Sequence, residues 1–227
     1  MTRSELNAPT SKATGSVWER KKLHAMREIQ RVALDLFDEH GFRNVTVEQI
    51  ATASNVSPSS IYRYFGTKEA LILWDEYDPQ FIELLAQEGG EVVTPAEFVG
   101  MIRAAVPALV QELAADEERI RRRMRYVVSQ PDVRDGLARQ TRQLEGVLRA
   151  VIAQRIGRGA GDLDVRLLAA IAAWGFDAAL DYWGETGFEL PLADALTYVI
   201  EALTRSAEAV LSFPPPDLGP KDTPGQS

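Results

Sequence analysis

Apolar residues recur at helical spacing along most of the chain, and small polar residues, Gly and Pro mark where the helices begin and end. Between residues 18 and 40 a stripe with a period of about 3.6 predicts a first helix, carried by Met26, Ile29, Ala33, Leu36 and Phe37. Gly41, which follows at once, suits the positive φ that often ends a helix. Because no stretch shows convincing period-two alternation, the pattern predicts an all-α fold.

Two short helices are expected between residues 46 and 65, joined by a tight turn. Thr46 and Gln49 have the spacing of a capping box at the start of the first. Asn55 tolerates the left-handed backbone of a sharp turn, and Ser57 followed by Pro58 starts the next helix. This pattern predicts a helix-turn-helix, whose second helix enters the major groove of DNA.

The second of these helices has one apolar side and one polar side. Ile61 and Phe65, four residues apart, are expected to be buried, while Ser59, Tyr62 and Arg63 fall on the opposite side. Farther along, helices are expected over residues 68–87, 94–113, 116–129, 132–156, 163–185 and 191–212. Pro79 and Pro107 should disturb the first two of them.

Residues 29 to 72 contain four spaced motifs, A-x-x-L-F-x-x-x-G-F, T-V-x-x-I-A, V-S-x-S-x-I-Y-R-Y-F and G-T-K-E-A-L. With these motifs the segment resembles the tetracycline-repressor (TetR) family of bacterial regulators, although Asn55 stands where the family usually has glycine. The resemblance implies a homodimer with two DNA-binding heads and a helical C-terminal domain with an effector pocket. We therefore predict a flexible arm (1–17), a three-helix helix-turn-helix DNA-binding domain (18–67), a helical effector-binding and dimerisation domain (68–212) and a disordered tail (213–227).

Charge is distributed unevenly. The net charge is −8, but residues 1–68 hold ten Lys and Arg against seven Asp and Glu, whereas the remainder holds fifteen against twenty-six. The positive part is the one expected to bind DNA. Arg20, Lys21 and Lys22 either extend along phosphates or the minor groove, or form a solvated helix start.

Composition excludes several other classes of protein. There is no Cys, which removes disulfides, Cys-type zinc sites and thiol catalysis. No apolar run approaches the roughly 18 residues of a membrane span, and the N-terminus has no signal sequence, so we expect a cytoplasmic protein without a membrane partner. Asp177 and Asp181 share a helix face, but no nucleophile motif, phosphate loop or metal-spaced His accompanies them. We expect no enzyme, no metal and no cofactor.

Candidate DNA contacts come from the helix-turn-helix. Base and phosphate contacts are expected from Pro58, Ser59, Ser60, Tyr62, Arg63 and Tyr64, and backbone contacts from Thr46, Val47 and Lys68. The alternative for both tyrosines is packing within the helices. Arg63 is either a reader of guanine or a phosphate clamp.

Candidates in the C-terminal domain are fewer and less specific. A pocket for a large hydrophobic effector, such as a fatty-acyl compound, is predicted from Trp74, Tyr77, Phe81, Phe98, Met101, Met124, Trp174 and Asp177. A dimer interface is predicted from Leu167, Ala170, Ala178, Leu196, Ile200 and Leu203. The basic run 118–125 is either a solvated face paired with Asp116, Glu117 and Glu118, or the source of an arginine that holds an acidic effector.

The function expected from these features is a ligand-responsive homodimeric repressor that binds a palindromic operator in double-stranded DNA and is released by a small effector. The alternatives are an activator, a non-inducible DNA-binding protein, and a small-molecule-binding scaffold with a vestigial helix-turn-helix.

Overall fold

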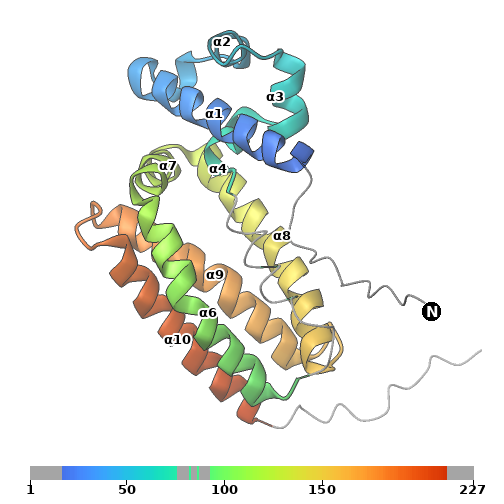
Figure 1. The fold of residues 1–227 in the computed structure, drawn as a ribbon. Coiled ribbons are helices and arrows are strands. Elements are labelled where there is room, and N and C mark those ends of the chain that lie inside the picture. Colours follow the sequence, from blue (N-terminus) through green and yellow to red (C-terminus); the bar gives the residue numbers. More distant parts are fainter. Residues whose placement is uncertain (1–16, 76–81, 83–85, 87–92, 214–227) are drawn as a thin grey trace, which may run out of the picture. The chain divides into compact units, whose positions relative to one another are not determined.

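A computed structural model describes residues 17–75, 82, 86 and 93–213, and the chain divides into two compact units, one ending at Leu71 and the other beginning at Ile72 (Figure 1). The described residues form helices and contain no strand, as the apolar pattern predicts. The predicted arm at 1–16, the tail at 214–227 and the predicted kink at Pro79 lie outside the described residues.

The first unit contains α1 (Val17–His40), the 3-10 turn η1 (Phe42–Asn44), α2 (Val47–Ala53), α3 (Pro58–Phe65) and the start of α4 (Lys68–Leu73). Its core brings Phe37 of α1 against Phe42 of η1, with ring centroids 5.0 Å apart in an edge-to-face arrangement. Ile50 of α2 and Ile61 of α3 are fully buried in the same unit. Helix α1 packs against η1 and α2, and α2 packs against α3, so each short element is held by a neighbour.

Local sequence sets the ends of these helices. Thr46 and Gln49 form both halves of the predicted capping box, and Ser57 caps α3 with Pro58 in its first turn. Asn55 has a φ of +54° and Gly41 one of +84°, as expected for the turn and for the end of α1. The tight turn that defines the helix-turn-helix is present.

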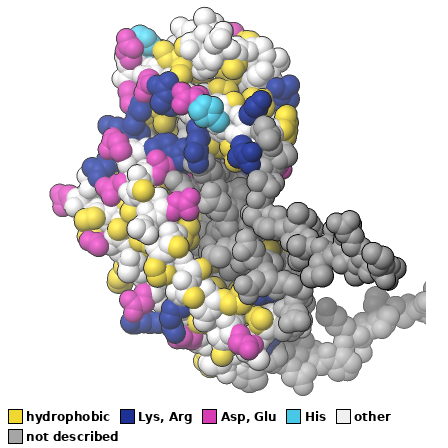
Figure 2. All heavy atoms as spheres, viewed as in Figure 1, with side chains coloured by type: hydrophobic (Ala, Val, Ile, Leu, Met, Phe, Trp, Pro, Cys, Tyr) yellow, Lys and Arg dark blue, Asp and Glu magenta, His cyan; other side chains and the backbone are white. Residues whose placement is uncertain are grey.

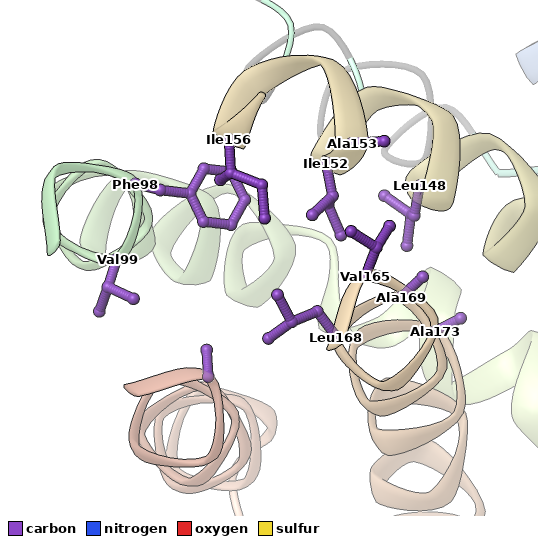
Figure 3. Close-up of a cluster of buried hydrophobic side chains, with 11 residues drawn as sticks. Phe98, Val99, Leu148, Ile152, Ala153, Ile156, Val165, Leu168, Ala169 and Ala173 are labelled. Carbon is purple, nitrogen blue, oxygen red and sulfur yellow. The ribbon is translucent and has the colours of Figure 1, made fainter. Parts of the chain in front are cut away.

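The second unit is a bundle of α6 (Pro95–Ala115), α7 (Glu117–Ser129), α8 (Pro131–Ile156), α9 (Leu163–Glu185) and α10 (Leu192–Ser212). Helix α9 packs between α8 and α10, and α10 also packs against α6. Figure 3 shows the apolar cluster where α6, α8 and α9 meet, with Phe98 and Ile156 close together and Val165, Leu168, Ala169 and Ala173 projecting from α9. Ala207 of α10 belongs to the same cluster, which therefore joins four helices of the bundle.

Two helices differ from expectation. Helix α4 was predicted to continue through residue 87, but it ends at Leu73, and Trp74 and Asp75 are not helical. Helix α6 remains helical through Pro107, which we expected to disturb it. It is also long and apolar enough, over Ala96–Ala115, to resemble a membrane span by length and composition. That resemblance is weak, because core helices of soluble proteins have the same composition.

Candidate functional site

The outer side of α3 presents the polar residues that were predicted to meet DNA. Tyr62 is 51% exposed and Arg63 is also exposed, while Ile61 of the same helix is buried. Arg63 lies over the ring of Tyr64, with its guanidinium carbon 5.0 Å from the ring centroid, and an Nη2 atom donates to the Tyr64 hydroxyl at 3.3 Å. The two side chains therefore support each other at the surface.

A cluster of hydroxyl groups begins α3. The Oγ of Ser57 accepts from the amide of Ser60 at 3.2 Å and lies 2.8 Å from the Oγ of Ser59 and 2.9 Å from the Oγ of Ser60. Pro58 beside them is exposed. Since hydroxyls donate and accept, this cluster offers hydrogen bonds to phosphate or to base edges.

The three predicted backbone contacts have different environments. Thr46 is exposed and accepts the amide of Gln49 at 3.2 Å, whereas the side chain of Val47 is buried. The Nζ of Lys68 donates to the carbonyls of Phe42 at 2.9 Å and Val45 at 3.1 Å, and lies 4.2 Å from the Phe42 ring centroid. Two of the three donors of Lys68 therefore already hold the first unit together.

Helix α1 carries the basic start that the sequence indicated. Arg20 and Lys21 are exposed, and Lys22 lies 5.8 Å from the ring centroid of the exposed Trp18. Farther along α1, Arg31 pairs with Glu28 and Asp35 on the surface. Figure 2 shows basic and acidic side chains interspersed on the visible face of the molecule. The basic character is thus concentrated at the start of the helix.

The second unit contains a cavity of about 480 Å³ that is partly open to solvent, within the size range of small-molecule sites. It is lined by the end of α4, Asp75, and helices α6 to α10, and six of its thirty lining residues are polar or charged: Asp75, Arg123, Gln140, Thr141, Asp177 and Thr204. The apolar part includes Phe98, Leu148, Ile152 and Leu168, which belong to the cluster in Figure 3. The cavity suits a mainly apolar ligand.

Half of the predicted pocket residues line this cavity: Phe98, Met101, Met124 and Asp177. Trp74 is not among the lining residues, and neither is Trp174, whose Nε1 donates to the Oε2 of Glu145 at 3.1 Å. Tyr77 and Phe81 lie outside the described residues. Sequence reasoning missed the small lining residues of α6, α9 and α10, including Ala104, Ala105, Ala172, Ala173 and Ala207, because it selected large side chains.

Arg123 connects the cavity wall to the end of α4. Its Nε donates to the carbonyl of Ile72 at 2.7 Å, its Nη2 to that of Leu73 at 3.0 Å, and its Nη1 to the Oδ2 of Asp75 at 2.8 Å. The side chain is only 11% exposed. This arginine caps the last carbonyls of α4, which have no partner within the helix itself.

Other members of the basic run form the paired face that was one of the two expectations for it. Arg119 pairs with Asp116, and Arg121 pairs with Glu117 and Glu118. Arg121 also lies over the ring of Trp183, 5.7 Å from its centroid. Arg123 reaches the cavity, but its donors bind protein groups.

Asp177, on α9, is the third charged residue that lines the cavity, after Asp75 and Arg123. Burial, together with the negative charge of Asp181 one turn away, raises the pKa of Asp177 to about 6 from an ordinary value of 3.8. The Oδ1 of Asp181 is buried without a hydrogen-bond partner in the part of the chain that is described. Within the same part, no cluster of acidic or His side chains has the arrangement of a metal site.

The predicted interface residues divide into exposed and buried positions. Leu167 and Ala178 are exposed on α9, and Ala170 is half-buried. Leu196 and Ile200 of α10 are buried within their own unit, and Ile200 and Leu203 line the cavity. The exposed large apolar residues of the two helices are Leu163, Leu167, Tyr182 and Tyr198.

Two family descriptions match the chain. The first covers part of the first unit and extends two residues into the second, and the other lies within the second unit. Residues 29–73 match the bacterial regulatory proteins of the tetR family, and residues 96–208 match the MftR C-terminal domain. The chain is 30% identical over 166 residues to the HTH-type transcriptional regulator TcmR of Streptomyces glaucescens, which covers 69% of this chain and 73% of TcmR. It is 26% identical over 155 residues to the transcriptional regulator MftR of Mycobacterium tuberculosis, which covers 68% of this chain and 75% of MftR.

A solved structure has the same fold. NalD of Pseudomonas aeruginosa, the secondary repressor of the MexAB-OprM multidrug efflux pump, aligns with a TM-score of 0.52 and 18% identity over 81% of this chain and 96% of its own. One conclusion follows from the helix-turn-helix unit, the helical second unit and the similarity to TcmR. The chain belongs to the tetR family of bacterial regulatory proteins and is a DNA-binding transcriptional regulator, not an enzyme.

Proposed function

We propose that this regulator is a cytoplasmic homodimeric repressor that binds a near-palindromic operator and is released when a small, mainly apolar effector occupies the second unit. The observation that carries the proposal is the cavity of about 480 Å³ inside a unit that follows a helix-turn-helix in the same chain. A regulator that only coated DNA would have no need for such a cavity.

The proposed DNA contacts combine base reading with phosphate binding. Tyr62 and Arg63 project from the exposed side of α3, and Arg63 is the candidate for the O6 and N7 acceptors of guanine. The hydroxyls at the start of α3 and Thr46 at the start of α2 are candidates for phosphate contacts. Lys68 is expected to act mainly by fixing η1 and the start of α2, since two of its donors are already occupied.

The proposed dimer forms through the outward sides of α9 and α10. On α9, Leu167, Ala178 and Tyr182 lie at intervals of eleven and four residues, close to whole helical turns, so they share one face. Tyr182 is 63% exposed, and Tyr198 on α10 is 77% exposed. Because Leu196 and Ile200 are buried in their own chain, the contribution of α10 is assigned to Tyr198 and its exposed neighbours.

Effector binding is proposed to act through the end of α4. Ile72, Leu73, Asp75 and Arg123 line the cavity and are joined by hydrogen bonds, and α4 begins at Lys68, within the DNA-binding unit. A ligand that displaces Arg123 would change the support of the last turn of α4. The effector must bind the two states with different affinities, since otherwise it shifts no equilibrium.

The proposal is tested by selecting binding sites from a random DNA pool with the purified full-length chain at two salt concentrations. We expect a two-fold-symmetric motif whose half-sites are separated by one or more helical turns. Binding should weaken at the higher salt concentration in proportion to the number of phosphate contacts.

A variant for comparison is Arg63→Ala, which should retain the fold and select a motif that is relaxed at one base pair of each half-site. The selection is done with the protein as purified and again after unfolding and refolding, which removes a bound ligand. If a folded wild-type dimer yields no motif in either case, the operator proposal is refuted and the scaffold alternative is favoured. A selected motif whose binding is strengthened by ligand would refute release by effector.

A further inference from the structure

The charges that line the cavity do not balance. Its lining contains three charged residues, Asp75, Arg123 and Asp177. Arg123 forms an ion pair with Asp75 and also donates to the carbonyls of Ile72 and Leu73. These two opposite charges offset each other, so the cavity is left with the negative charge of Asp177.

Asp177 has no matching cation in the described part of the chain. No ion pair or hydrogen bond reaches its carboxylate there, and the nearest charged influence is Asp181, which has the same sign. A half-buried carboxylate next to a second one is unfavourable for folding unless something offsets its charge. Buried, unmatched charges of this kind are common at ligand sites.

The two threonine hydroxyls of the lining also offer acceptors to a ligand. The hydroxyl of Thr141 donates to the carbonyl of Leu137 at 3.0 Å, and that of Thr204 donates to the carbonyl of Ile200 at 2.7 Å. Each hydroxyl hydrogen is therefore used, and the oxygen lone pairs remain. Together with the carboxylate of Asp177, these groups are suited to a ligand that donates hydrogen bonds.

The rest of the cavity is suited to a hydrocarbon body. Helix α9 lines the cavity from Leu168 in the apolar cluster to Leu180, with Asp177 near the far end. Asp177 follows Leu168 by nine positions, which corresponds to about 13.5 Å along a helix. A ligand could thus place an apolar chain among Phe98, Ile152 and Leu168 and a polar group against Asp177.

Building on the effector role proposed above for this cavity, we infer that its ligand is an apolar molecule with a protonated amine, and that Asp177 binds the amine. A protonated amine carries a positive charge, which would pair with the carboxylate of Asp177. It also carries N–H donors, which the acceptors of the lining can bind. A ligand with a carboxylate at this position would add a third negative charge beside Asp177 and Asp181.

The inference is tested by calorimetric titration of the full-length protein at neutral pH with n-decylamine, n-decanol and n-decanoate, each below the concentration at which it aggregates. These probes share a chain and differ in the charge of one end. Wild-type protein should bind the amine at least about tenfold more tightly than the alcohol, with the carboxylate weakest, since hydrogen bonds between charged partners are the stronger ones.

Asp177→Asn keeps the shape of the side chain and removes its charge, so the preference for the amine over the alcohol should disappear. Asp181→Asn is the matched control, because Asp181 lies one turn away and is not a lining residue. It should retain the preference. Circular dichroism of both variants establishes that they are folded.

The inference is overturned if wild-type protein binds amine and alcohol equally, if it binds none of the three probes, or if Asp177→Asn retains the preference. Operator binding with and without n-decylamine is measured separately. If the amine binds through Asp177 and operator affinity is unchanged, the ligand class stands and release by effector fails. If operator is released by a neutral probe alone, release stands and the ligand class fails.

Discussion

The contacts of Arg123 lead to a quantitative prediction for Arg123→Ala. The side chain makes three hydrogen bonds, to the carbonyls of Ile72 and Leu73 and to the carboxylate of Asp75, and it is 11% exposed. The substitution leaves two carbonyls and one carboxylate without this donor. Breaking a buried pair costs about 3–5 kcal/mol.

The expected loss is at the lower end of that range. Water can enter the space left by the side chain from the cavity and hydrate the abandoned oxygens, so we expect the free energy of unfolding of the second unit to fall by about 3 kcal/mol. Urea denaturation followed by circular dichroism and by the fluorescence of Trp174 and Trp183, both in that unit, measures it.

Arg103→Ala is the matched control, since Arg103 also forms an ion pair with a carboxylate far away in the sequence, Glu208, but is 62% exposed. Its loss should be about 0–1 kcal/mol. In addition, a double-mutant cycle with Asp75→Asn should give a coupling free energy of about 1 kcal/mol or more. Equal losses for the two arginine variants, or a coupling near zero, would show that the contacts of Arg123 do not stabilise the end of α4.

Three further variants test the remaining proposals. Arg63→Ala should weaken operator binding by about 1–3 kcal/mol and relax specificity at one base pair, measured by fluorescence anisotropy with operator variants; uniform weakening would assign Arg63 to phosphate instead. Tyr182→Glu should shift the dimer towards monomer in light scattering, whereas Val147→Glu, on the exposed side of α8, should not. Asp177→Asn should stabilise the chain more at pH 7 than at pH 4, by about 1 kcal/mol after allowance for solvent screening. The folded chain holds the Asp177 proton up to a pKa of about 6 and the unfolded chain only to about 3.8, so wild-type stability falls as pH rises through this window. A constant difference across pH would refute the assignment.

Helix starts were predictable because their signals are local. Thr46 with Gln49, Ser57 with Pro58, and Thr94 with Glu97 each lie within a few residues, and the structure has all three caps. The end of α4 was not predictable in the same way. Its last carbonyls are capped by Arg123, about fifty residues away, and no local pattern announces that partner.

The exposure of a candidate residue was predictable where its helix has one apolar side and one polar side. The exposed side of α3 follows from its short helical pattern, so the exposure of Tyr62 and Arg63 could be predicted. Helix α10, in contrast, is apolar on more than one side, and periodicity alone could not tell whether Leu196 and Ile200 face the chain's own core or a partner. The cavity lies beside several small alanine side chains. A search of the sequence for large side chains overlooks these residues.

Because of the cavity in the second unit, the thermal stability of the chain should report the binding of a ligand. Side chains that border a void lack neighbours on one side, so a compound that fills the void restores contacts that the free chain does without. A compound present at about a hundred times its dissociation constant raises the free energy of unfolding by about 2.7 kcal/mol through mass action. A gain of that size moves a melting temperature by several degrees. Compound libraries can therefore be screened by heating the purified chain alone, before any operator is known.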